Sequence, residues 1–207
     1  MIKKIKKVVT AKRLAIIMAL IALVSFGYKL TIGILATSLV LIVAAFPTLF
    51  VFICKALYAK NMEQSRAYKK KTYFWMMIAT ASFVVIFILF SVLKVGGIDI
   101  TNKNRFEGWV GIIFIFFIIA MFVLSIINLK GALNKTDLVV IGIKEISFVS
   151  ALADAVMINA FLYRVLLKYL NLPFMGLLNN SFPLAVGVLM AVVPIFMFKR
   201  WLKYEVN

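Results

Sequence analysis

Side chains capable of chemistry are scarce in the apolar parts of this chain, and the most informative group lies between residues 144 and 180. The stretch KEISFVSALADAV places an aspartate, Asp154, well inside an apolar run. At about 100° per residue of helix, Ser147 and Ser150 fall on the same side as Asp154. A stripe of hydroxyls and a carboxylate can line an ion or proton path, or contact a polar ligand. The candidate residues for this path are Asp154, Ser150, Ser147, Asn159, Arg164, Asn179 and Asn180.

A purely structural interpretation of Asp154 competes with this functional one. An aspartate near the bilayer centre costs about 2.5–3.5 kcal/mol on insertion scales, so its carboxylate should face protein or water. A hydrogen bond to a neighbouring helix would meet that need without any further role. Asn179, Asn180 and Ser181, in the stretch LLNNSFP, are the expected partners. The two asparagines are also of a type that caps a helix shortly before a proline such as Pro183.

The inventory of residues argues against most forms of catalysis. The chain has no histidine, which removes zinc-protease motifs and the Ser-His and Cys-His nucleophilic pairs. Asp154 is the one deep carboxylate expected, with Glu145 near the inner boundary. On one helix these two would be about 14 Å apart along the axis and on opposite faces, too far apart for paired-acid catalysis. The sequence has no phosphate-binding glycine-rich motif, and the single cysteine, Cys54, allows no disulfide within the chain. We therefore expect no enzyme activity, no cofactor and no bound metal.

The composition indicates a membrane protein. Of 207 residues, 65% are hydrophobic, and the mean hydropathy is +1.08. Soluble domains are nearer half apolar, so a soluble fold of this size could not bury so much apolar surface. The formal charge of +17 is better explained by the cations that membrane proteins gather in cytoplasmic loops than by nucleic-acid binding.

The apolar segments predict an all-α, polytopic integral membrane protein with six transmembrane helices in a single domain, residues 1–207. A transmembrane helix needs about 20 residues. The segment 14–54 is too long for one span, so we divide it at the stretch SFGYKLTIG, where Gly27 and Gly33 flank Lys29 in an expected turn. Pro47 is expected to kink the second span. The predicted spans are 12–28, 32–57, 72–93, 109–129, 140–168 and 178–198.

The distribution of basic residues predicts that both termini are cytoplasmic. With six spans, 18 of the 24 lysines and arginines fall on the inner side and 6 on the outer side, where Lys29 is placed in the first turn. This bias is the one that the positive-inside rule describes. Anionic lipids of the inner leaflet attract such clusters. The expected lipid contacts are Lys3, Lys4, Lys6, Lys7, Lys69, Lys70 and Lys71.

Two classes of function are left open. The first is a non-catalytic membrane protein of the cell membrane that acts by binding another membrane component, in an accessory, scaffold or immunity-type role. Its small size and short loops favour this class, with a protein partner or a second copy of the chain, and no nucleic acid, as the binding partner. The alternative is a small oligomeric transporter or channel with Asp154 in its polar path. The abundance of Lys, Ile and Phe is typical of AT-rich bacterial genomes and indicates a bacterial plasma membrane.

Overall fold

The computed structural model describes the backbone of residues 2–35, 38–60, 64–97, 137–170 and 175–204, and residues 116, 119, 120, 122, 123, 126 and 127. Side chains are described in these ranges except at 2–12, 14, 164–170 and 175. Five long helices fill these ranges: α1 (Ile2–Leu35), α2 (Leu39–Lys60), α3 (Arg66–Val95), α5 (Leu138–Leu170) and α6 (Met175–Lys203). Each contains a stretch long and apolar enough to cross a bilayer, so the protein is all-helical and of the multi-pass membrane type.

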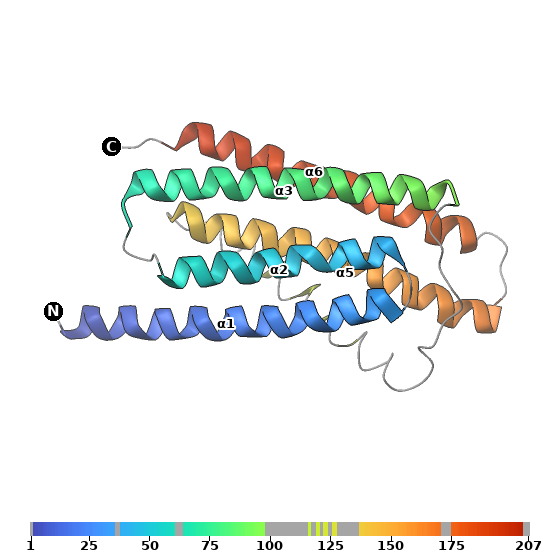
Figure 1. The fold of residues 1–207 in the computed structure, drawn as a ribbon, viewed down its shortest axis with the longest axis horizontal. Helices are drawn as coiled ribbons and strands as arrows, with labels where there is room; N and C mark the ends of the chain where they lie inside the picture. Colours follow the sequence, from blue (N-terminus) through green and yellow to red (C-terminus); the bar gives the residue numbers. More distant parts are fainter. Residues whose placement is uncertain are drawn as a thin grey trace.

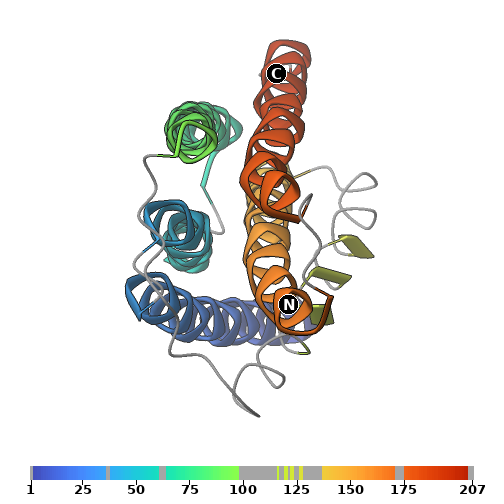
Figure 2. The ribbon, with the colours of Figure 1, turned by 90° about the vertical axis from the view of Figure 1, so that its right-hand side faces the viewer.

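The five helices pack side by side along their length (Figure 1). An end-on view shows α5 and α6 in one row and α2 and α3 in another (Figure 2). Helix α2 packs against α5, and α3 packs against α6, while α1 packs chiefly on α2. The core lies between the two rows, where Val40, Phe87, Ala153 and Met190 are fully buried. Helix α5 is the most buried of the spans and α1 the least.

Helices α3 and α5 run in the same direction (Figure 1). Lys69, in the first turn of α3, contacts Asp137 immediately before α5, so the two helices begin at the same end of the bundle. The chain termini and the end of α2 also lie at this end (Figure 1). The chain therefore leaves α3 at one end of the bundle and starts α5 at the other.

The expected turn around Lys29 is wrong. Helix α1 continues through Gly27 and Lys29 to Leu35, and α2 begins at Leu39. The reason is that Lys29 is buried against other helices, so its charge does not mark an exposed loop. The close approach of the two helices comes at Gly33, where an added Cβ would lie 2.8 Å from the backbone nitrogen of Ile42.

The remaining helices extend beyond the predicted spans. The predictions 72–93, 140–168 and 178–198 correspond to helices α3, α5 and α6, each longer at both ends. Basic and aromatic residues extend the start of α3 and the end of α6 past the apolar segment, since such side chains suit the membrane interface. Most of the predicted span 109–129 lies outside the described residues, and those described within it are helical. Pro47 lies inside α2, and Pro183 and Pro194 lie inside α6.

Candidate functional site

A buried ion pair joins α1 to α5. The Lys29 ammonium lies 2.5 Å from Oδ1 of Asp154, and each residue is only 2% exposed. The contact is a close ion pair rather than an aligned hydrogen bond to that oxygen. Both charges lie within candidate membrane spans. The pair is neutral as a whole, which lowers the cost of placing each charge away from water.

Helix α2 completes this cluster with a hydroxyl. Lys29 Nζ donates a hydrogen bond to Thr48 Oγ1 at 2.8 Å, and Thr48 Oγ1 is hydrogen-bonded to Ser150 Oγ at 2.7 Å. Ser150 and Asp154 are one turn apart on α5. The polar cluster Lys29–Thr48–Ser150–Asp154 therefore links three helices. Thr48 follows Pro47, which has no backbone N–H to donate within α2.

This cluster corrects the prediction that Asp154 is the one deep charge and that its partners lie at the start of the last span. Its partner is Lys29, which the sequence pattern had assigned to a turn. Asn179 instead accepts a hydrogen bond from Asn159 at 3.4 Å, which joins α6 to α5. Asn179 and Asn180 lie inside α6, five and six residues into it if counted from Met175, so they do not cap its start.

The other predicted site residues with described side chains do not belong to this cluster. Ser147 donates its hydroxyl proton to the backbone carbonyl of Ile143, one turn earlier on its own helix. Asn180 is half-buried. The side chain of Arg164 lies outside the described residues. Among the six of these residues whose side chains the structure describes, only Ser150 and Asp154 belong to this cluster.

A second buried carboxylate lies nearer the end of the bundle that holds the termini. Glu145 on α5 is 5% exposed, accepts a hydrogen bond from Tyr73 of α3 at 2.7 Å, and forms an ion pair with Arg200 of α6. An added Cβ at Gly142 would lie 2.9 Å from the Tyr73 ring, so the missing side chain lets Tyr73 reach Glu145. Sequence reasoning placed Glu145 at the inner boundary but named neither partner.

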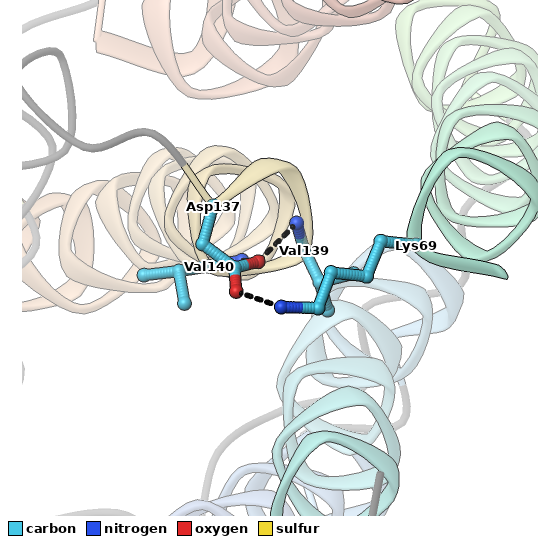
Figure 3. A network of polar contacts seen from close by, with 4 residues as sticks. All are labelled: Lys69, Asp137, Val139 and Val140. Carbon is cyan, nitrogen blue, oxygen red and sulfur yellow. Dashed lines mark hydrogen bonds and ion pairs between the residues drawn. The ribbon is translucent and has the colours of Figure 1, made fainter. Parts of the chain in front are cut away.

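Lysines of α3 also make contacts at this end. Lys69 Nζ lies 2.6 Å from Oδ2 of Asp137, whose Oδ1 accepts hydrogen bonds from the backbone nitrogens of Val139 and Val140 (Figure 3). Lys70 donates to the carbonyl oxygen of Tyr204 at 2.7 Å and lies over the Trp201 ring. Lys71 is exposed. The side chains of Lys3, Lys4, Lys6 and Lys7 lie outside the described residues.

An apolar groove runs between α2 and α3. It consists of two adjoining cavities of about 380 and 530 Å³, sizes typical of ligand pockets. Phe50, Ile53 and Ala79 line both cavities. Ile146 and Val149 of α5 line the larger one, which therefore reaches down to α5. Neither Lys29 nor Asp154 lines either cavity.

No family model, curated protein or solved structure matches this chain.

Proposed function

We propose that this protein is a non-catalytic, multi-pass membrane protein that acts by binding another membrane component, in an accessory, scaffold or immunity-type role. The groove between α2 and α3 is the observation that carries this proposal. Its lining is almost wholly apolar, and exposed side chains such as Ile53 and Ile86 stand along it. A recessed apolar surface on a membrane helix pair suits a ligand that is itself dissolved in the membrane.

The polar cluster supports this function over transport. A transport path through Asp154 needs a carboxylate that can exchange a cation or proton during the cycle. In this structure Lys29 neutralises the Asp154 carboxylate, and the ion pair is buried among α1, α2 and α5. The cluster therefore acts as a structural link between α1, α2 and α5.

A small transporter remains a second candidate because two opposite charges lie deep in the bundle, beside a helix that contains Pro47. Such a helix can rearrange its freed backbone groups around a cavity. Flux through proteoliposomes tests it. A transporter of this kind would lose flux in the Asp154→Asn variant, and unchanged flux would remove Asp154 from the path.

We propose further that the chain crosses the bacterial plasma membrane six times with both termini in the cytoplasm. The parallel directions of α3 and α5 support this number, since an odd number of crossings must join them. The basic residues support the orientation, because the end of the bundle with the termini also holds Lys69, Lys70 and Arg200.

Photo-crosslinking in intact membranes tests the binding function. A photoreactive amino acid replaces Ser82, an exposed residue that lines the larger cavity. The control position is Leu189 on α6, which is 58% exposed outside the groove. We expect a reproducible product, protein or lipid, from position 82 that position 189 does not give. The same unselective products from both positions would contradict the proposal.

A further inference from the structure

We infer that the component bound in the groove is a phospholipid with an anionic headgroup, its acyl chain lying between α2 and α3 and its headgroup at Lys69. This inference rests on the proposed binding function and names the ligand class for the same site. It is carried by the shape of the groove, by the one-sided distribution of its polar side chains, and by the charge around its polar end.

The length of the groove fits an acyl chain from one leaflet. Along α2 its lining extends from Val43 in the larger cavity to Tyr58 in the smaller one. Fifteen residues of helix correspond to about 22 Å, whereas one leaflet contributes about 15 Å to the hydrocarbon core. A chain starting at the membrane surface therefore finds apolar lining over its whole length.

The polar side chains of the lining gather at one end. The smaller cavity lies by the end of α2 and the start of α3, and its polar lining residues are Tyr58, Tyr68, Lys69 and Thr72. The larger cavity is lined by apolar residues apart from two small hydroxyl residues of α3, Thr80 and Ser82. Thr80 donates its hydroxyl proton to the backbone carbonyl of Met76, so it presents little polarity to a ligand. A ligand with one polar end and one long apolar end matches this lining.

The charge at the polar end favours an anion. Residues 55–71 contain six basic side chains and a single carboxylate, Glu63. Lys69 lines the cavity and also contacts Asp137, and its ammonium has three protons to donate. It can therefore hold a phosphate oxygen while it keeps its contact with Asp137. A lysine next to an anionic headgroup contributes about 1 kcal/mol, a factor of about five in affinity.

Quenching of Trp75 by brominated lipids tests this inference. Trp75 lines the smaller cavity and is 59% exposed. The two other tryptophans, Trp109 and Trp201, are replaced by phenylalanine so that Trp75 alone reports. The protein is reconstituted in phosphatidylcholine vesicles that contain brominated phosphatidylglycerol or, at the same mole fraction, brominated phosphatidylcholine. We expect stronger quenching by the anionic lipid, because it occupies the groove in preference to the neutral one.

Matched variants separate the groove from the general basic surface. Lys69→Gln should lower the preference for phosphatidylglycerol about fivefold, whereas Lys203→Gln, an exposed lysine on α6, should leave it unchanged. Asp137→Asn also breaks the Lys69 ion pair but keeps the cation, so it should retain the preference. Ala79→Phe should fill the groove and abolish the preference, and the control Ala185→Phe, at an exposed position on α6, should not.

Several outcomes would overturn the inference of a bound anionic lipid. The crosslinking result then shows whether the proposed binding function fails as well. Equal quenching by both brominated lipids would show that the groove does not select an anionic lipid. The same result would follow if residues 98–136 of the chain itself filled the groove. A crosslink from position 82 to a protein, together with equal quenching, would refute the lipid and retain the binding function. Failure of both experiments would remove the binding function as well.

Discussion

At the scale of single residues, α5 carries two buried carboxylates, and each is matched by a cation from another helix. Asp154 pairs with Lys29 of α1, and Glu145 pairs with Arg200 of α6. Removing one partner of a buried pair leaves an uncompensated charge, which typically costs about 3–5 kcal/mol, whereas replacing both by apolar residues is often neutral or stabilising. We therefore expect these pairs to specify which helices meet α5 more than to add net stability.

The Lys29–Asp154 pair should show this asymmetry directly. We expect Lys29→Met and Asp154→Leu, made singly, each to lower the free energy of unfolding in detergent by about 3–5 kcal/mol. The double variant should recover most of that loss, because no buried charge remains. Denaturant titrations of the purified protein measure all three values. A double variant as unstable as the sum of the two single ones would contradict this account.

At the scale of elements, the hairpin of α1 and α2 depends on close packing near its turn. Helix α1 is the least buried span and packs chiefly on α2. Gly33 is the point of closest approach to the backbone of Ile42. Because a backbone atom cannot rotate away as a flexible side chain can, the position admits no larger residue without a shift of the helices.

Two glycines of α1 provide a matched test of the hairpin. Gly33→Ala places a Cβ 2.8 Å from the Ile42 nitrogen, and overpacking of this kind typically costs about 1–3 kcal/mol. Gly27→Ala meets no atom within 4 Å, so it should be neutral or should stabilise the helix by up to about 1 kcal/mol. Thermal unfolding in detergent compares the two variants. Equal effects would show that the approach at Gly33 is not tight.

The start of α5 is set by Asp137, which accepts hydrogen bonds from Val139 and Val140 (Figure 3). Asp137→Ala should lower the free energy of unfolding by about 0.5–2 kcal/mol, the usual cost of losing an N-terminal cap. Asp137→Asn keeps an oxygen acceptor and loses only a part-exposed ion pair with Lys69, so it should cost less than about 1 kcal/mol. Denaturant titrations that gave equal losses would instead assign the main effect to the ion pair.

At the scale of the whole molecule, the directions of the helices and the basic residues at one end of the bundle both agree with the proposed six-span topology. The starts of α3 and α5 and the end of α6 meet at one end of the bundle, where Lys69, Glu145 and Arg200 lie. The opposite end holds the end of α3 at Gly96. With the basic end in the cytoplasm, Gly96 should face the outside.

Labelling of single cysteines with a membrane-impermeant maleimide tests this topology. The background is Cys54→Ser, since Cys54 is the one native cysteine and is buried. We expect Gly96→Cys to react in intact cells, whereas Gln64→Cys and Lys203→Cys should react only after the membrane is opened. Labelling of both Gly96→Cys and Lys203→Cys from outside would imply an even number of crossings between α3 and α5 and would refute the six-span proposal. Labelling of Gln64→Cys and Lys203→Cys but not Gly96→Cys would instead reverse the proposed orientation.

Much of the fold could be predicted from the sequence because hydropathy is a local property. Apolar runs placed both ends of α3, α5 and α6 to within six residues of the observed bounds. The membrane class followed from the apolar composition, and the burial of Asp154 followed from the cost of exposing charge to lipid. The turn near Lys29 could not be placed in this way, because a lysine inside an apolar segment is equally consistent with an exposed loop and with a buried ion pair.

The candidate site was decided by the tertiary structure. Asp154 and Ser150 were identified from their spacing on one helix, but Lys29 and Thr48 come from two other helices. Their meeting depends on how α1 and α2 pack against α5, which no periodicity within a single segment encodes. The groove likewise arises from the spacing between α2 and α3 above α5. The sequence by itself determined that this chain belongs in a membrane and that Asp154 is buried in α5, whereas packing between helices determined the partner of Asp154, the burial of Glu145 and the groove.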